Sequence, residues 1–172
     1  MELTETLRRR RSVRRYAPDP VPEELLERLV AAANRAPTAS NVPYREILVV
    51  DDPRIVRAIR QISPAMLANP PALLVVLTDV RMAVERIGPC GPICSLVDSG
   101  AAGENVLLAA VDEGLGAQFT MISAMAGIRV ILGLPEHVRV DLLIPVGYPA
   151  PGPPVRGSGR PTFRVHRNQY GR

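Results

Sequence analysis

Two short apolar runs, residues 46–51 (EILVVD) and 72–78 (ALLVVLT), place the strongest constraint on how this chain folds. Runs of this length and composition predict buried strands. Residues 140–147 (VDLLIPVG) predict another strand, and residues 117–122 (AQFTMI) a further one. We therefore expect a sheet at the centre of the molecule.

Helices are predicted around these runs. Residues 22–36 carry the clearest pattern, because Pro22 suits a first helical turn, glutamates follow it, and Pro37 ends the helix. Apolar stripes and polar starts predict four more helices, over residues 2–10, 53–62, 98–113 and 125–133. Residues 11–20 are expected to be extended because they contain prolines, and residues 87–94 (IGPCGPIC) to form a loop.

The order of these elements favours the α+β fold class. Helices and strands mix without the strict alternation of a doubly wound parallel sheet. No G-x-G-x-x-G sequence follows a predicted strand, which argues against a Rossmann dinucleotide site. The length of 172 residues fits one domain. Residues 148–172 are rich in proline and glycine, so we expect this tail to wrap around another surface.

Composition excludes several classes of protein. Hydrophobic residues make up 47% of the chain, so disorder is not expected. No apolar run approaches the ~20 residues of a membrane span. The charged start, MELTETLRRR, lacks the apolar stretch of a signal peptide. These features predict a cytoplasmic protein that has no membrane partner.

Cysteine and histidine are too few to predict a metal site. The only cysteines are Cys90 and Cys94, and the only histidines, His137 and His166, lie far from them in sequence. A closed zinc or iron–sulfur site normally needs about four ligands. We therefore expect no metal, and we expect the two cysteines to be ordinary thiols.

A cluster of arginines at residues 8–15 has three possible interpretations. The net charge is +4, and the 21 basic residues are all arginine. The cluster could be a solvated basic stretch, a nucleic-acid contact or a phosphate clamp. The modest net charge and the 3% aromatic content argue against nucleic acid. In an extended segment Arg10, Ser12 and Arg14 would point the same way, which suits a terminal phosphate.

Three other motifs, each taken alone, are weak evidence for a functional site. Residues 36–44 (APTASNVPY) read as a turn between a helix and a strand. Gly114 is expected just after the end of a helix. The run GSGRP at 157–161 is either a flexible tail or the carrier of a further phosphate-binding arginine, Arg160.

Taken together, these runs resemble the nitroreductase family. RRSVRRYAPDPVPEELLERLVAAANRAPTASN resembles its N-terminal signature, VDSGAAGENVLLAAVDEGLGAQFTM its central helix and following strand, and LLIPVGYPAPGPPVRGSGRPTFRVHRNQYG its closing segment. The resemblance covers nearly the whole chain in order. It implies a mainly antiparallel central sheet flanked by helices, in one domain spanning 1–172. It also implies an intertwined homodimer with a swapped C-terminal tail and FMN bound by both subunits.

The resemblance also implies which residues bind FMN. Those near the N-terminus are Arg10, Arg11, Ser12 and Arg14, and Arg160 would meet the same phosphate from the tail. The loop that reaches the flavin from the partner chain would be Pro37, Thr38, Ala39, Ser40 and Asn41. The residues that flank the flavin ring would be Leu115, Gly116, Phe119 and Thr120.

The chain departs from the family pattern in three places. Where the family commonly has Gln-Pro-Trp after Asn41, residues 42–45 read Val-Pro-Tyr-Arg, so either the Gln is replaced or the loop is shortened. Residues 63–66 (SPAM) replace a stretch that carries Asn and Lys in many members. Residues 81–96 are short where longer members insert helices, which suggests an open pocket. These differences leave the contacts at 42–45 and 63–66 and the identity of the acceptor undecided.

The activity implied is an oxidoreductase reaction. NADH or NADPH would deliver hydride to FMN, and a small-molecule acceptor such as a nitroaromatic or quinone would then be reduced in a ping-pong sequence. Arg14 is the candidate to stabilise the reduced flavin, and no acid–base residue stands out. The alternatives are other flavin chemistry of the family, such as dehalogenation or flavin cleavage, or a non-catalytic flavin- or nucleotide-binding module. Nucleic acid is not expected as a partner.

Overall fold

The computed structural model describes residues 1–120, 122–152 and 163–171. Its helices are α1 (Leu3–Arg9), α2 (Glu23–Asn34), the 3-10 turn η1 (Ala39–Asn41), α3 (Pro53–Gln61), α4 (Val80–Ile87), α5 (Gly91–Asp112) and α6 (Met125–Leu132). Its strands are β1 (Arg45–Val50), β2 (Ala72–Asp79), β3 (Gly116–Ala117) and β4 (Val138–Gly147). The strand order is β1-β2-β4-β3, and all neighbours are antiparallel. The predicted α+β class is confirmed.

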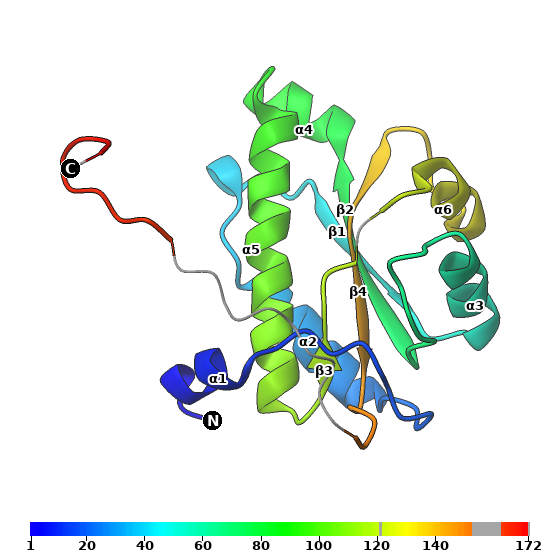
Figure 1. Ribbon diagram of the computed structural model, residues 1–172. Helices are drawn as coiled ribbons and strands as arrows, with labels where there is room; N and C mark the ends of the chain where they lie inside the picture. The colour runs from blue at the N-terminus through cyan, green and yellow to red at the C-terminus, as the bar shows by residue number, and fades with distance from the viewer. Residues whose placement is uncertain (121, 153–162, 172) are drawn as a thin grey trace.

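Helices cover both faces of this sheet (Figure 1). α2 and α5 lie on one face, and α3 and α6 lie on the other. The interior strand β2 is buried along its whole length and sends side chains alternately into the two cores. Leu74 and Val76 pack with α2 and α5, whereas Leu73 and Val75 pack with α3 and α6. This two-sided burial explains why residues 72–78 form an unbroken apolar run.

A β-bulge interrupts β4 at Asp141. The pairing of β4 with β2 shifts between Val76 and Leu77, which face Leu142 and Val140, so Asp141 is the extra residue. A bulge changes the direction of the side chains that follow it. The carboxylate of Asp141 therefore turns toward α5 and not into the core beside α3.

The predicted loop at residues 87–94 is wrong in its second half. α4, which was not predicted, ends at Ile87, and its cap residue Gly88 has a φ of 93°, which is unfavourable for other residues. α5 then begins at Gly91, with a proline in its first turn, seven residues before the predicted start at 98. Glycine and proline suit the end of one helix and the start of the next, and here they mark a helix–helix junction.

The predicted strand at 117–122 is also too long. β3 covers only Gly116–Ala117, and Thr120 returns to β4 through a single bridge with Leu143. On its other side β3 is joined by the N-terminal segment, since the backbone N–H of Val13 donates to the carbonyl of Ala117 at 3.2 Å. The expectation that residues 11–20 are extended is consistent with this pairing.

The C-terminal residues 163–171 extend away from the body of the chain (Figure 1). Phe163 and Tyr170 are each 91% exposed, and Val165 is 85% exposed. Wrapping of this tail around a second chain stays a prediction. Within the described part of the chain, no helix is both long and apolar enough to cross a membrane.

We predict that Gly91→Ala destabilises the protein. A Cβ at this position would lie 2.2 Å from the backbone oxygen of Ala83 in α4. The free energy of unfolding should fall by about 1–3 kcal/mol, measured by urea denaturation at one fixed protein concentration. Gly127→Ala is the matched control, because its Cβ would meet only the flexible end of Ile62. An equal loss in both variants would contradict the backbone contact.

Candidate functional site

Three of the clustered arginines have carboxylate partners. Arg8 and Arg9 on the exposed side of α1 both pair with Glu5, at 2.7 and 2.5 Å. Arg10 lies just beyond α1, with its Nε 3.2 Å from Oε1 of Glu104 on α5. Exposed pairs such as those of Arg8 and Arg9 contribute little to stability. Arg9 also lines a cavity beside Gly116, whereas Arg10 lies between α1 and α5.

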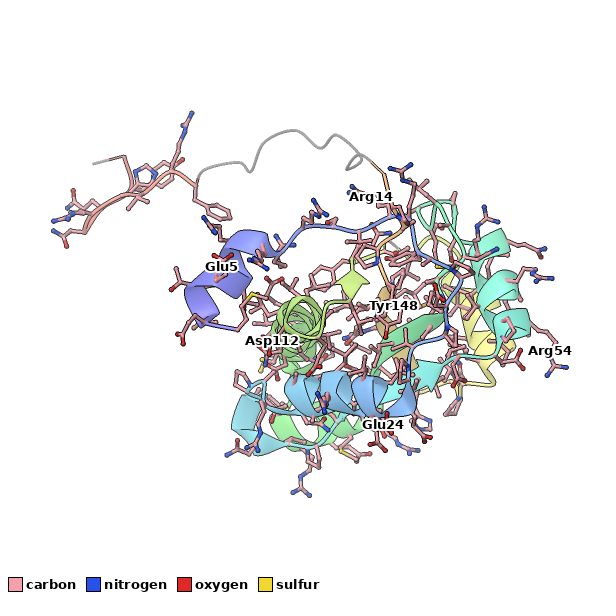
Figure 2. The ribbon with its side chains drawn as sticks, turned by 90° about the horizontal axis from the view of Figure 1, so that it is seen from below. Glu5, Arg14, Glu24, Arg54, Asp112 and Tyr148 are labelled. Atoms are coloured by element: carbon pink, nitrogen blue, oxygen red, sulfur yellow. The ribbon has the colours of Figure 1, made fainter. Side chains whose placement is uncertain are left out.

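Arg11 and Arg14 have no ion-pair partner among the described residues. Arg11 lines a cavity of about 410 Å³ together with Leu115 and Gly116. Figure 2 shows Arg14 on the side of the molecule opposite α2. The hydroxyl-bearing residue Ser12 is exposed between the two arginines. This segment therefore presents uncompensated positive charge and a hydroxyl at the β3 edge of the sheet.

Gly116 is required for this segment to lie against β3. A Cβ at Gly116 would be 2.6 Å from the side chain of Val13. The segment is also held further along, because the backbone N–H of Ala17 donates to the carbonyl of Tyr148 at 2.8 Å. The structure thus places the arginine segment beside Leu115 and Gly116.

Phe119 and Thr120 line a second cavity, of about 430 Å³, between α5 and β4. Thr120 is buried, and its Oγ1 has no hydrogen-bond partner within the part of the chain that the structure describes. Phe119 is 42% exposed although it is large and apolar. An unpartnered buried hydroxyl beside an exposed ring is suited to a ligand that supplies both a polar atom and a flat apolar surface.

The wall of this second cavity is rigid because of the bulge residue Asp141. Its side chain is 1% exposed and accepts a hydrogen bond from Arg139 Nε at 2.5 Å. Thr78 and Ser99 donate to its other oxygen at 2.6 Å each. Arg139 also donates to Ser95 Oγ at 2.8 Å. The network ties β2, β4 and α5 together, and sequence analysis did not identify it.

The loop at residues 37–41 is held in an unusual backbone conformation. Ser40 and Asn41 have φ values of 54° and 55°, in the left-handed region that non-glycine residues seldom adopt. Asp98 of α5 accepts a hydrogen bond from the backbone N–H of Ala39 at 2.7 Å. The guanidinium of Arg45 donates to backbone carbonyls on both sides of the loop entrance, including those of Ala36, Pro37 and Asp98.

Tyr44 also helps to hold the loop at 37–41, together with Asp98 and Arg45, and we call these three residues the loop anchor. Its side chain is fully buried, and its hydroxyl donates to the carboxylate of Asp98. Burial raises the pKa of Tyr44 to about 12, and the hydrogen bond to Asp98 adds to the shift. The phenol therefore keeps its proton, and remains a donor, at neutral pH. Sequence analysis treated residues 42–45 as a departure from the family and Asp98 as a helix start, and it missed that they form one anchor.

The candidate site residues fall into two groups within one chain. Figure 1 shows the loop at 37–41 on one side of α5 and the segment from Leu115 to Thr120 on the other. The arginine segment lies with the second group. The structure of a single chain therefore does not bring the loop to the remaining candidate residues.

The remaining sequence-derived candidates are the tail arginine, the stretch 63–66 and the two cysteines. Arg160 lies outside the described residues. In the replaced stretch 63–66, Met66 packs in the core beside α3, and Ser63 is buried with no hydrogen-bond partner for its Oγ among the described residues. Cys90 is exposed and Cys94 half-buried, both as free thiols. Residues 1–120, 122–152 and 163–171 contain no cluster of three His, Cys, Asp or Glu side chains arranged to hold a metal.

Comparison with known proteins agrees with this architecture. The model of the nitroreductase family matches residues 7–81 and 58–148. A protein of Methanothermobacter thermautotrophicus named "Putative NADH dehydrogenase/NAD(P)H nitroreductase" is 33% identical over 176 aligned residues, which cover 99% of this chain and 88% of that protein.

Solved structures share the fold. A protein of the same name from Parabacteroides distasonis is 28% identical and superimposes with a TM-score of 0.83 over 98% of both chains. The NADPH:FMN oxidoreductase of Vibrio harveyi, solved with NAD+, is 27% identical, with a TM-score of 0.83 over 98% of this chain and 77% of that one.

We predict that Tyr44→Phe loosens the loop at 37–41. Loss of the hydroxyl leaves the buried carboxylate of Asp98 short of one donor, which should lower the free energy of unfolding by about 1–3 kcal/mol. Amide hydrogen exchange at Ala39 should become faster. Tyr148→Phe is the control, since the structure shows no hydrogen bond from the Tyr148 hydroxyl to another described residue. Unchanged exchange at Ala39 in Tyr44→Phe would show that Asp98 holds the loop without Tyr44.

Proposed function

Because this chain belongs to the nitroreductase family of NAD(P)H-dependent oxidoreductases, we propose that it acts as an FMN-dependent homodimer that reduces nitroaromatics, quinones or similar acceptors in a ping-pong sequence. One observation carries the proposal. The candidate FMN residues lie on two sides of α5, and the outer face of α5 is apolar and exposed. A second copy of the chain covering that face would bring a loop at 37–41 to each set of remaining residues.

The exposed face of α5 supports association with a second copy. Ile93 and Val97 are each 69% exposed, and Leu96 is 50% exposed. Ile93, Val97 and Gly100 follow helical spacing and form one stripe along the helix. A contiguous exposed apolar surface of this kind is typical of a protein–protein contact. An intertwined dimer built on this face and on the C-terminal tail would bury well over ~2,000 Å², as obligate dimers do.

The residues near the N-terminus fit the phosphate of FMN. Arg11 and Arg14 carry positive charge that no described carboxylate neutralises, and Ser12 offers a hydroxyl between them. Arg10 would contribute a further charge beside its partner Glu104. Guanidinium groups bind phosphate through paired, charge-assisted hydrogen bonds. Arg160 would approach the same phosphate from the tail.

The second cavity fits the flavin ring. Thr120 offers an unpartnered buried hydroxyl there, and Phe119 offers an exposed aromatic surface. The partner's loop at 37–41 would cover the opposite face of the flavin ring. Asp98 and Tyr44 would hold Ser40 and Asn41 of that loop in place. Rigid walls matter because a loosely held ring would lose its orientation toward both substrates.

Bound FMN would supply the chemistry, accepting hydride from NAD(P)H and passing electrons to the acceptor. The protein's own residues position the ring, exclude water around it and shape the charge. Arg14 is a half-buried cation without an ion-pair partner in the described ranges, so it would favour the negative charge added on reduction. No side chain of this chain is assigned an acid–base role.

We predict that the purified protein is a flavin-bearing dimer. Light scattering should give twice the 18.6 kDa chain mass, with visible flavin absorbance in the same peak that is lost when NADH or NADPH is added without oxygen. Val97→Glu should give a monomer that has lost its flavin, because the charge would be buried at the dimer face. Val130→Glu is the control, since Val130 is 81% exposed on α6. A wild-type monomer that retains flavin would refute the two-chain site.

We also predict that only some arginines bind FMN. Each charged hydrogen bond to phosphate contributes about 1.5–3 kcal/mol, so Arg10→Ala and Arg160→Ala should each weaken FMN binding roughly tenfold to a hundredfold. Arg8→Ala and Arg9→Ala should do far less, because both side chains pair with Glu5 on the exposed face of α1. FMN titration at two salt concentrations tests the contrast. Equal losses in all four variants that vanish at high salt would indicate a diffuse charge effect.

A further inference from the structure

A third cavity, of about 690 Å³, opens between α4, α6 and the start of β4. Its apolar lining consists of Val80, Val84, Met125 and Val138. Its charged lining consists of Arg81, Arg129, Arg139, His137, Glu85 and Glu136. No candidate residue for FMN binding lines it. The proposed FMN site therefore does not account for this cavity.

Arg129 is the unusual group in this cavity. Its Nε is buried and has no hydrogen-bond acceptor within the described part of the chain. Neither Arg129 nor Arg81 has an ion-pair partner among the described residues. A buried N–H of a charged group without an acceptor is unfavourable, so it marks a place where a ligand could supply the acceptor.

The other charged groups limit where an anion could lie. Glu85 and Glu136 are exposed and would repel an anion. The Nε2 of His137 already has a carboxylate neighbour, because it lies 3.8 Å from Asp79. Arg139 is already held by Asp141 and is not free to follow a ligand. The cations of this cavity that have no ion-pair partner among the described residues are therefore Arg129 and Arg81.

The third cavity adjoins the one assigned above to the flavin ring. Met125 and Arg139 line both cavities. A molecule placed across this shared boundary would have one end beside Thr120 and the other beside Arg129. Its first end would be a flat ring, and its second end would be anionic.

We propose that this third cavity binds the phosphate groups of the nicotinamide dinucleotide reductant, with Arg129 as the principal contact. The proposal rests on the function proposed above, since it requires the nicotinamide to reach a flavin in the neighbouring cavity. The dinucleotide has the required form, because its phosphates are separated from the hydride-donating ring. The apolar side chains of Val84 and Met125 would lie against its uncharged parts.

The test compares Arg129→Gln with the matched control Arg57→Gln, an exposed arginine on α3 that lines none of these cavities. NAD+ and NADP+ binding to the FMN-loaded protein is measured by calorimetry. Reduction of the bound flavin is followed with NADH, with NADPH and with 1-benzyl-1,4-dihydronicotinamide, a hydride donor that has no phosphate. Unfolding midpoints are measured for both variants.

We expect Arg129→Gln to weaken dinucleotide binding about tenfold or more, by loss of a charged hydrogen bond, and to leave reduction by the phosphate-free donor unchanged. A loss for NADP+ alone would assign the contact to its 2′-phosphate, and an equal loss for both dinucleotides would assign it to the pyrophosphate. Unchanged dinucleotide binding, or equal slowing with all three reductants, would overturn the proposal. A wild-type protein that binds no FMN would instead contradict the proposed function, and calorimetry with NADP+ would still test the cavity.

Discussion

The burial requirement of α5 organises the rest of the structure. One side of this 22-residue helix packs on the sheet and α2, and the opposite side presents Ile93, Leu96 and Val97 to solvent. The helix thus completes the core of its own chain, and we propose that a second copy covers its exposed apolar residues. The same helix separates the two groups of candidate site residues, so the step that buries its outer face would also assemble the site. Under this proposal, stability and function would depend on one interface.

The charged side chains fall into two groups, buried carboxylates that stabilise the fold and arginines that are available to a ligand. The buried carboxylates Asp98 and Asp141 are satisfied by donors from other elements, and each connects α5 to a loop or strand. Burial of a charge is tolerated only with such partners. Arg11, Arg14 and Arg129 have no ion-pair partner among the described residues, and they line cavities or the exposed β3 edge. Since the chain has no lysine, every cationic contact to an anionic ligand falls to arginine.

Sequence patterns predicted most helices and three strands to within a few residues, because the apolar periodicity of a buried element is a local property. The errors occurred where local chemistry is ambiguous. Gly88 and Gly91 suggested a loop, yet they close one helix and begin another, and Gly91 is needed because α4 passes close to it. The segment after Ala117 has strand-like composition, but it leaves the ladder before Thr120, and only the arrangement of β4 and the N-terminal segment shows this.

The sequence by itself determined the fold class and the family resemblance, since these follow from periodicity and short motifs, and that resemblance in turn implied which residues would meet a flavin phosphate. Tertiary structure alone decided how those residues are used. It placed the loop at 37–41 and the ring-flanking residues on opposite sides of α5, joined Tyr44 to Asp98, and turned Asp141 toward α5 through a bulge. It also placed Arg129 at a cavity with its buried Nε lacking a hydrogen-bond partner among the described residues. These outcomes depend on contacts between residues far apart in the chain, and no local pattern encodes the distance between them.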